Sequence, residues 1–308
     1  MDAPLVSIVV VSYRTKDLTL TALRTVFDQT EAGTFELLVV DNASDDGSAD
    51  AIAEEFGDRL TLIRSEENLG FAWANNLAAE RARGEYLLLL NPDTEVLDRA
   101  IDRLLEFART RPQAGIWGGR TLFKDRSLNP ASCWQRITPW STVCMATGLR
   151  AVFKESNLFN PEGIGGWRRD SEREVDIVVG CFLLTRLETW RALGGFDLRY
   201  FMYGEEADLC LRARALGCRP AITPEAEIIH LVGASSPDDT RKEALITKAR
   251  VTLVRTHWPA WQVPFGLSMF WTWALLKAVA ARLRGRPQPH GSLFSMRKDW
   301  LAGYPPLA

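Results

Sequence analysis

Four short runs rich in Val, Ile and Leu constrain the fold of this chain most strongly, at residues 6–11, 37–40, 60–63 and 86–90. Near-continuous apolar runs of this length are typical of parallel strands that are buried on both faces. The stretches between and after them are long enough for crossover helices with a polar face, at residues 18–27, 49–56, 72–82 and 100–108. The pattern predicts an α/β fold with a doubly wound, mainly parallel sheet.

The second half of the chain is less regular. We expect strands at 176–185 and 226–231 and helices at 187–193, 207–216 and 238–255. Residues 124–174 lose their periodicity and accumulate Pro, Gly, Trp and Arg, which predicts irregular excursions. Trp134, Trp140 and Trp167 lie in this region. They are consistent with an aromatic platform for a bound molecule and equally with packing of surface loops.

The last part of the chain differs from the rest in charge. Residues 1–240 hold 26 basic and 37 acidic side chains, whereas residues 241–308 hold 11 and 2. This asymmetry suggests a tail that faces an anionic surface and argues against a nucleic-acid-binding protein. The tail also contains a strongly apolar segment at 263–281, interrupted by Pro264, Gly266 and Lys277. We favour a helix at a membrane interface over a full span, and a core helix is the alternative.

Several classes of protein are excluded by what the chain lacks. The turn after the first predicted strand contains no glycine, so a dinucleotide-binding GxGxxG turn is absent, and there is no P-loop. Neither HExxH nor GxSxG occurs. The five cysteines form no CxxC pair and the first residues lack the pattern of a signal peptide. These features lead us to expect a reduced, cytoplasmic protein.

Polar residues follow three of the predicted strands directly. Ser12 and Tyr13 follow the first strand, Asp41 and Asn42 the second, and the segment from Asn91 to Asp93 the fourth. Ligands of open α/β sheets bind beyond the carboxyl ends of the strands, so these side chains are expected to meet at one site. A ring and two carboxylates there could bind a base, a sugar and a cation-bound phosphate.

A second group of polar residues lies in the acidic segment at 204–212, which follows a Gly-Gly-Phe-Asp turn at 194–197. Glu205, Glu206 and Asp208 lie together at the start of a predicted helix. Such crowding should raise the pKa of one carboxyl group, as a general base requires. Capping of the helix N-terminus is the structural alternative, but capping explains one acid and not three.

The motifs together resemble those of family 2 glycosyltransferases, the inverting enzymes with a GT-A fold, and especially their rhamnosyltransferase-like branch. The resemblance covers about residues 5–235. It rests on the segments at 6–13, 39–48, 68–76, 90–93, 195–197 and 204–212, and on His230 with Gly233, Ala234 and Ser235. It implies a catalytic domain at 1–235, with a nucleotide-binding half at 1–120 and an acceptor half at 121–235. Residues 236–308 would form a helical, membrane-facing extension.

The resemblance also implies roles for single residues. Tyr13 and Asp41, with Ser12 and Asn42 beside them, would hold the base and ribose of a nucleotide sugar, and Gly70 and Asn75 would line its pocket. Asp93 would bind Mg²⁺ or Mn²⁺ at the diphosphate, with His230 assisting. The family's metal motif usually reads Asp-x-Asp, and here Asn91 takes the first place, which leaves one strong oxygen ligand.

The catalytic base is the second departure from the family pattern. The family's Glu-Asp motif ends here in Glu206, whose extra methylene shifts the carboxylate by about an ångström or more. Glu206 is the preferred base and Glu205 the alternative, while Asp208 would orient or cap. The implied reaction is a single inverting displacement on a nucleotide-diphosphate sugar.

The implied donor is dTDP-L-rhamnose and the acceptor a lipid-linked or polysaccharide glycan, at the inner face of the cytoplasmic membrane. Mannosyl, galactosyl or galactofuranosyl donors are alternatives. A non-catalytic nucleotide-sugar-binding partner is also consistent with Asn91 and Glu206, which replace the usual aspartates. A nucleotidyltransferase is disfavoured because it needs a glycine-rich basic loop after the first strand, which is missing.

Overall fold

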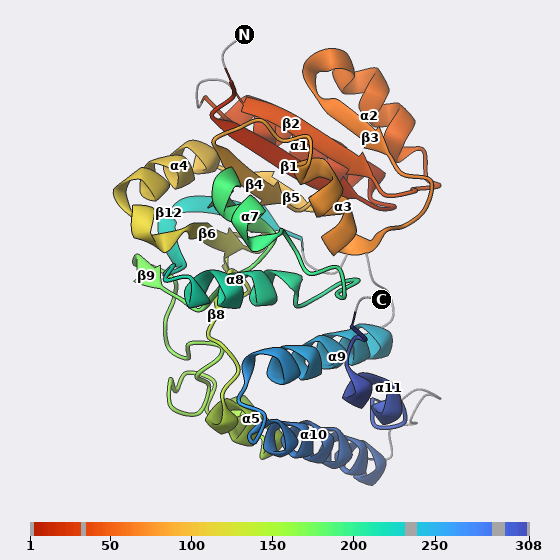
Figure 1. Ribbon diagram of the computed structural model, residues 1–308, viewed down its shortest axis with the longest axis vertical. Coiled ribbons are helices and arrows are strands. Elements are labelled where there is room, and N and C mark those ends of the chain that lie inside the picture. Colours follow the sequence, from red (N-terminus) through yellow and green to blue (C-terminus); the bar gives the residue numbers. More distant parts are fainter. Residues whose placement is uncertain (1–2, 32–34, 232–238, 285–292, 307–308) are drawn as a thin grey trace. The chain divides into compact units, whose positions relative to one another are not determined.

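The computed structural model describes residues 3–31, 35–231, 239–284 and 293–306. Its contacts divide the chain into two compact units (Figure 1). The first unit consists of residues 1–134, 168–201 and 205–235, and the second of residues 135–167, 202–204 and 236–308. The expected acceptor half at 121–235 included residues 135–167, whereas the contacts place these residues in the second unit. The reason is that Met145 shares an apolar core with side chains of the C-terminal helices.

The first unit is built on a mixed sheet with the strand order β3-β2-β1-β4-β11-β6-β12-β5. Its parallel half comprises β1 (Val6–Ser12), β2 (Phe35–Asp41), β3 (Thr61–Arg64) and β4 (Tyr86–Leu90). In the other half β6 (Ile116–Leu122) and β12 (Ala221–His230) are parallel to each other. The strands β11 (Phe182–Arg186) and β5 (Thr94–Val96) are antiparallel to their neighbours.

Helices cover both faces of this sheet, as a doubly wound fold requires. The α1 (Lys16–Gln29), α2 (Ser48–Phe56) and α4 (Ala100–Thr110) helices share one apolar core with alternate residues of β1, β2 and β4. The α3 helix (Gly70–Ala79) packs on β1 and β2, α7 (Leu187–Leu193) on β4 and β11, and α8 (Glu205–Ala215) beside β10 (Ile177–Val178). The predicted α/β fold with its mainly parallel sheet is confirmed.

The strand β6 was not predicted, because its sequence Ile-Trp-Gly-Gly-Arg-Thr-Leu is interrupted by two glycines. Both glycines lie where neighbouring atoms leave no room for a side chain. A Cβ at Gly119 would lie 2.2 Å from the Ala226 carbonyl oxygen, and one at Gly118 would lie 2.5 Å from the Val178 side chain. The register between β6 and β12 also shifts between Ile222 and Glu227. Glycine therefore marks a close approach of two strands here.

Two expected strands differ in their bounds, and the region expected to be irregular contains short elements. The run at 176–185 divides into β10 and β11, and β12 begins at Ala221, before the predicted 226. The irregular region at 124–174 contains short elements: β7 (Leu128–Asn129), β8 (Cys133–Trp134), α5 (Pro139–Ala146), α6 (Leu149–Val152) and β9 (Arg173–Glu174). Thr138 caps α5 through a reciprocal capping box with Ser141.

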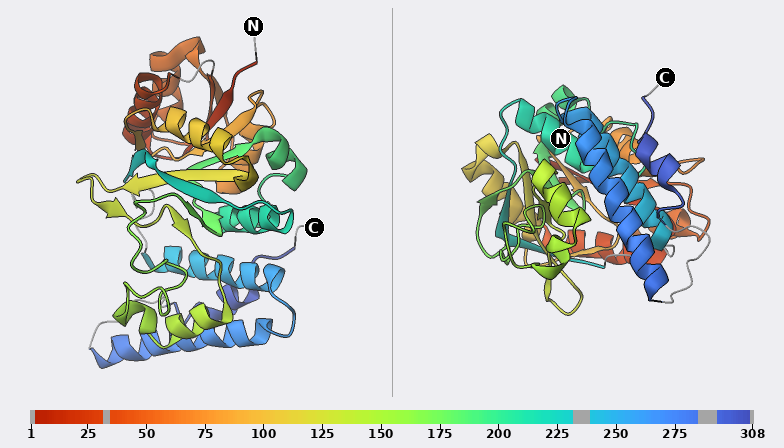
Figure 2. Two further views of the ribbon diagram at one scale, coloured as in Figure 1. Left: turned by 90° about the vertical axis from the view of Figure 1, so that its left-hand side faces the viewer. Right: turned by 90° about the horizontal axis from the view of Figure 1, so that it is seen from below.

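The second unit is helical. It contains α5 and α6 with α9 (Asp239–His257), α10 (Val263–Leu283) and α11 (Arg297–Ala302). Its core gathers Met145, Val251, Val254, Phe270, Ala274 and Trp300. Trp140 donates to the Leu158 carbonyl at 2.7 Å, whereas Trp134 belongs to the first unit. Figure 2 gives two further views of both units.

A buried ion pair joins the irregular region to α9 within the second unit. Arg250 contacts both carboxylate oxygens of Glu162, at 2.9 and 2.8 Å, and the Glu162 side chain is 8% exposed. Burial by itself raises the pKa of Glu162, but Arg250, Ser141 and Arg150 lower it further than burial raises it, so the pKa is lowered overall. Neutralising this carboxylate would leave an uncompensated buried guanidinium.

We therefore expect Glu162→Gln to lower the free energy of unfolding by about 3 kcal/mol at neutral pH, measured by urea denaturation. The difference from the wild type should shrink as the pH falls through the lowered pKa of Glu162, because the wild-type carboxylate is then protonated as well. The exposed Glu155→Gln is the matched control and should change stability by less than about 0.5 kcal/mol. Equal stability of both variants would contradict a stabilising pair.

Candidate functional site

The ends of β1 and β2 lie side by side at the carboxyl edge of the parallel sheet. Ser12 is in register with Asp41, and the main-chain N–H of Asn42 donates to the Ser12 carbonyl at 2.8 Å. The Ser12 hydroxyl is fully buried and contacts the Thr19 hydroxyl at 2.9 Å. Ser12 thus holds the strand end to α1, and its hydroxyl points away from solvent.

Only one of the two carboxylate oxygens of Asp41 accepts a hydrogen bond within the described part of the chain. The side chain is 4% exposed, and its Oδ2 accepts a hydrogen bond from the Ser44 amide at 3.2 Å. Its Oδ1 is buried and has no hydrogen-bond partner among the described residues. Tyr13 lies beside this edge, with the Arg14 guanidinium 5.2 Å from its ring centroid. An unused buried acceptor next to an aromatic ring suits a ribose hydroxyl and a base.

Two of the expected pocket residues use their side chains inside the protein. The Asn42 side chain donates to Asn68 at 3.0 Å and accepts from the Leu69 amide at 2.9 Å. The side-chain amide of Asn75 donates to the main-chain carbonyl of Phe71 at 2.8 Å. Both side chains therefore hold the start of α3 in place. Gly70 begins that helix with φ +76°, and a Cβ there would lie 2.5 Å from the Phe201 carbonyl oxygen.

Asn91, Asp93 and His230 meet where β4 ends and β12 ends. The His230 Nε2 lies 3.3 Å from an Asp93 carboxylate oxygen and 3.3 Å from the Asn91 amide nitrogen. Main-chain pairing fixes the arrangement, because His230 is in register with Thr94 and the Leu231 amide donates to the Asp93 carbonyl. Asp93 is 6% and His230 8% exposed. Asp93 and His230 were expected to act together, and the structure brings them into contact.

The electrostatics of this pair favour positive charge next to Asp93. Burial by itself lowers the pKa of His230, but Cys181 and Asp93 raise it, and the net result is a pKa of about 10. The Asn91 Oδ1 and His230 Nδ1 are buried and have no hydrogen-bond partner in the described part of the chain. Unpaired buried polar atoms of this kind are costly unless a ligand or water satisfies them.

These residues fit a divalent cation that is shared with a substrate. Mg²⁺ is usually held by one or two carboxylates together with substrate phosphates. Asp93 supplies one such carboxylate, and His230 becomes a ligand only when it gives up its proton. Over residues 3–31, 35–231, 239–284 and 293–306, no group of three or more His, Cys, Asp or Glu side chains could enclose a metal ion. Among these residues the side chains therefore do not form a closed cage for a metal ion.

The three acids of α8 have different surroundings. Asp208 is 1% exposed and pairs with Arg212 at 2.7 Å, while Glu205 is 4% exposed. Glu206 is half-buried, and its Cβ lies 3.7 Å from the position of a Cβ on Gly180. Gly180 precedes Cys181, whose carbonyl oxygen accepts a hydrogen bond from the main-chain N–H of Asn91 at 3.1 Å. Glu206 is therefore placed next to the segment that borders the Asn91 end of the site. The expected rise of one carboxyl pKa stays a prediction.

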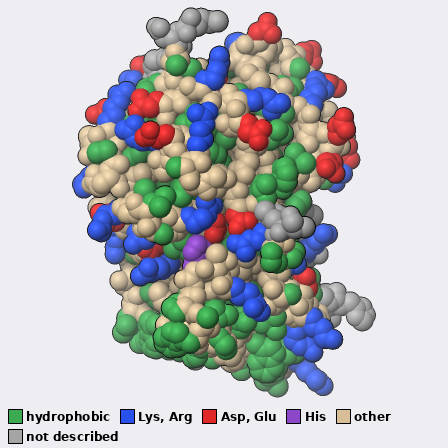
Figure 3. All heavy atoms as spheres, viewed as in Figure 1, with side chains coloured by type: hydrophobic (Ala, Val, Ile, Leu, Met, Phe, Trp, Pro, Cys, Tyr) green, Lys and Arg blue, Asp and Glu red, His purple; other side chains and the backbone are tan. Residues whose placement is uncertain are grey.

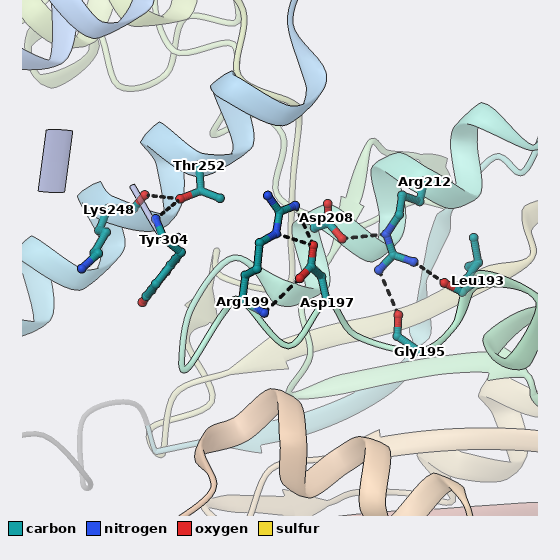
Figure 4. A network of polar contacts seen from close by, with 9 residues as sticks. All are labelled: Leu193, Gly195, Asp197, Arg199, Asp208, Arg212, Lys248, Thr252 and Tyr304. Atoms are coloured by element: carbon teal, nitrogen blue, oxygen red, sulfur yellow. Dashed lines mark hydrogen bonds and ion pairs between the residues drawn. The ribbon is translucent and has the colours of Figure 1, made fainter. Parts of the chain in front are cut away.

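Arg212 links α8 to the Gly-Gly-Phe-Asp turn, a role that the sequence did not reveal. Its guanidinium donates to the Leu193 carbonyl at 2.6 Å and to the Gly195 carbonyl at 2.9 Å while it pairs with Asp208 (Figure 4). In the same turn the carboxylate of Asp197 accepts from Arg199 at 2.6 and 2.8 Å. Asp208 thus positions Arg212, which satisfies carbonyls at the end of α7.

Asn76 is a second positioning residue that sequence reasoning left without a role. Its side chain donates to the Phe196 carbonyl and accepts from the Phe196 amide, both at 2.9 Å. Gly195 has φ +69°, and a Cβ there would lie 2.6 Å from the Asn76 oxygen. The motif Asn75-Asn76 on α3 therefore contributes one side chain to its own helix and the other to the turn before α8.

We expect Asn76→Asp to lower the unfolding free energy by about 1–3 kcal/mol, because the Phe196 carbonyl would then face a carboxylate and lose its donor. Turnover should fall along with stability, since the turn leads into α8. The exposed Asn157→Asp, with the same change of charge, serves as a control for the measurement by thermal denaturation. An unchanged midpoint in Asn76→Asp would contradict this positioning role.

Comparison with known proteins identifies the family. The model for glycosyl transferase family 2 matches residues 7–176, which include the ends of β1, β2 and β4 and the Asp93 position. This chain belongs to that family. The resemblance inferred from the motifs is thereby confirmed, and the relatives of this chain include proteins named as rhamnosyltransferases. Gly233, Ala234 and Ser235, which also contributed to the resemblance, lie outside the described residues.

Two curated relatives of this family 2 glycosyltransferase are informative. It is 30% identical over 291 residues to the O-antigen biosynthesis protein RfbC of Myxococcus xanthus; the match covers 92% of this chain and 21% of RfbC. It is 28% identical over 263 residues to the N-acetylglucosaminyl-diphospho-decaprenol L-rhamnosyltransferase of Mycobacterium tuberculosis, covering 80% of this chain and 81% of that enzyme. The chain thus spans about a fifth of RfbC, but most of the mycobacterial enzyme.

A solved structure supports the fold of this glycosyltransferase. The mannosyltransferase PcManGT from Pyrobaculum calidifontis, determined with GDP-Man and Mn²⁺, aligns with a TM-score of 0.57 and 18% identity. The alignment covers 98% of this chain and 86% of PcManGT. This likeness confirms the GT-A architecture of the chain. The ligand GDP-Man is reported for PcManGT and is not carried over to this chain.

Proposed function

We propose that this chain transfers L-rhamnose from dTDP-L-rhamnose to a lipid-linked glycan acceptor, with inversion at the anomeric carbon. The observation that carries the proposal is the long match to an L-rhamnosyltransferase, together with unpaired buried acceptor oxygens at the ends of β2 and β4. Another nucleotide sugar is the alternative donor, because donor choice depends on the shape of the pocket.

In this reaction the residues of the sheet edge bind the donor. The unused oxygen of Asp41 accepts a ribose hydroxyl, and the Tyr13 ring lies against the base. Asp93, and His230 in its neutral form, would hold a divalent cation at the diphosphate end. When bound, Mg²⁺ or Mn²⁺ offsets the negative charge that develops on the departing diphosphate.

The acceptor side is served by α8. The Glu206 carboxylate removes the proton from the acceptor hydroxyl while that oxygen attacks the anomeric carbon, and the bond to the diphosphate breaks in the same step. Glu205 is the alternative base. Asp208 acts through Arg212, with which it forms an ion pair.

We also propose that the enzyme works at the cytoplasmic face of a membrane, where a lipid-linked acceptor is anchored. The mycobacterial relative's name includes a decaprenol acceptor. In the described part of the chain one helix, α10, is long and apolar enough to cross a membrane, and 17% of its most apolar stretch is buried. This combination supports membrane association.

The proposal is tested by incubating the purified full chain with candidate nucleotide sugars, Mn²⁺ and a lipid-linked acceptor and measuring released nucleoside diphosphate. We expect release from dTDP-L-rhamnose that requires the acceptor. A thermal shift with the same donors reports binding separately, because a ligand selective for the native state raises its stability. Neither binding nor release with dTDP-L-rhamnose, while another donor is turned over, would contradict the assigned donor.

A further inference from the structure

The outward face of α10 is apolar and uncovered in the described part of the second unit. Phe265, Leu276, Val279 and Leu283 fall on one side of the helix and are 42%, 48%, 45% and 83% exposed. No charged side chain occurs on α10 between its start and Lys277. Hydrophobic side chains gather over α5 and α10 at the lower edge of Figure 3. A contiguous apolar surface of this kind marks an interaction site in a soluble protein.

The opposite face of the same helix packs against protein. Phe270 and Ala274 are buried in the core of the second unit with Val251 and Val254 of α9. Lys277 lies on this inner side, where it forms an ion pair with Glu243 of α9. The usual pattern of a surface helix, apolar inside and charged outside, is therefore replaced by a helix that is apolar on both faces.

A second group of exposed apolar side chains lies in the same unit, on the segment that follows α5. Val152, Phe153 and Leu158 are 73%, 46% and 63% exposed, and Trp140 of α5 is 43% exposed. The α5 and α10 helices pack against each other and lie side by side in both views of Figure 2. Trp261, just before α10, is 78% exposed. Exposed tryptophans at the margin of an apolar surface are typical of membrane interfaces.

Basic side chains border this apolar surface. Arg282 and Arg284 follow the apolar part of α10, and Lys154 follows Phe153; all three are exposed. Among residues 241–308 there are 11 basic side chains and 2 acidic ones. A surface with this charge attracts anionic lipid headgroups, whereas two copies of it would repel each other. The charge therefore favours lipid over a second copy of the chain.

A full transmembrane span is disfavoured by what packs on the inner face of α10. The α9 helix carries seven charged side chains, and its Glu243 pairs with Lys277. A span that kept this packing would bring those charges into the hydrocarbon, which is costly. An orientation parallel to the membrane keeps α9 on the water side.

We infer that the outward face of α10 and the apolar segment after α5 form a membrane-docking surface, on which α10 lies in the plane of an anionic bilayer. Hereafter this is the docking surface, made of Phe265, Leu276, Val279, Leu283, Val152 and Phe153. The inference rests on the proposed function only for its purpose, which is to bring the enzyme to a lipid-linked acceptor.

The docking surface is tested with the full chain and vesicles of phosphatidylcholine with or without phosphatidylglycerol, separated by sedimentation. The double variant Leu276→Asp, Val279→Asp should lower the partition coefficient about a hundredfold, because two large apolar side chains no longer leave water. Leu216→Asp is the matched control, since Leu216 is 68% exposed in the first unit, and it should bind as the wild type does. Equal binding of wild type and double variant would overturn the inference.

Two further measurements separate the alternatives. Arg282→Glu with Arg284→Glu should weaken binding to anionic vesicles and leave binding to neutral ones unchanged. Trp271 lies near the middle of α10, so in-plane binding predicts stronger quenching of its fluorescence by bromines near the headgroups than by bromines at the bilayer centre. Trp271→Phe defines its share of the signal, and the reverse order of quenching would overturn the in-plane orientation.

A second copy as the occupant is checked by light scattering without lipid. A dimer that the double variant abolishes would overturn lipid as the partner. The thermal shift of the double variant with nucleotide sugars should match the wild type, because the donor residues lie in the first unit. Loss of vesicle binding with a retained donor shift is thus distinguishable from failure of the proposed function, in which the donor shift itself is missing.

Discussion

Glu206→Gln should lower turnover about 10²- to 10⁴-fold while the chain still binds its nucleotide sugar. The amide has nearly the shape of the carboxylate but cannot accept the proton of the acceptor hydroxyl. Glu206 is only half-buried, so the change should leave the fold intact. Turnover is measured as release of nucleoside diphosphate at saturating donor, and donor binding as a thermal shift.

Two neighbouring variants make this test specific. Glu205→Gln should retain most of the turnover if Glu206 is the base, and the opposite ranking would assign the role to Glu205. Glu206→Asp keeps a carboxylate but withdraws it by about an ångström, so we expect a loss of about 10²-fold, smaller than that of the amide variant if proton removal dominates. Wild-type turnover in Glu206→Gln would remove this residue as the base.

Asp93→Asn should abolish the part of donor binding that depends on a divalent cation. Among the described residues Asp93 supplies the only carboxylate in contact with His230. The neutral amide introduced by the substitution would bind a cation more weakly than this carboxylate does. Turnover should fall about 10²- to 10³-fold, as when one group that stabilises developing charge is removed. Thermal shifts with nucleoside diphosphate, measured once with Mn²⁺ and once with a chelator, show how much of the binding depends on the cation.

The exposed Asp58→Asn is the matched control for Asp93→Asn, because it makes the same change of charge on the surface of the same unit. It should show the wild-type response to Mn²⁺. A response to Mn²⁺ that persists in Asp93→Asn would place the cation elsewhere, and absence of any response in the wild type would contradict a cation at this site.

The parallel half of the sheet was predictable because its strands are unbroken apolar runs. Successive residues of β1 such as Val9 and Val10 point to opposite faces of the sheet and are both fully buried. Burial of both faces leaves a clear trace in the sequence. The strand β6 leaves no such trace, since Gly118 and Gly119 are required by contacts with Val178 and Ala226 that lie far away in the chain. The membership of residues 135–167 in the second unit was hidden for the same reason.

The site could be predicted only in part. The ends of strands place Asp41 and Asp93 at one edge, and this follows from topology alone. The direction in which each side chain points does not follow from topology. Asn42 and Asn75 were therefore expected at the ligand, although their side-chain amides form hydrogen bonds with the main chain at the start of α3. The role of Asn76 was invisible because its partner, Phe196, is 120 residues away.

The most direct measurement is a crystal structure of the chain with Mn²⁺ and a non-transferable analogue of dTDP-L-rhamnose. We expect the ribose at the unpaired oxygen of Asp41, the diphosphate and Mn²⁺ at Asp93 with His230, and the Glu206 carboxylate facing the anomeric carbon from the side opposite the diphosphate. An analogue bound away from Asp41 and Asp93, or one whose anomeric carbon is turned from Glu206, would contradict it.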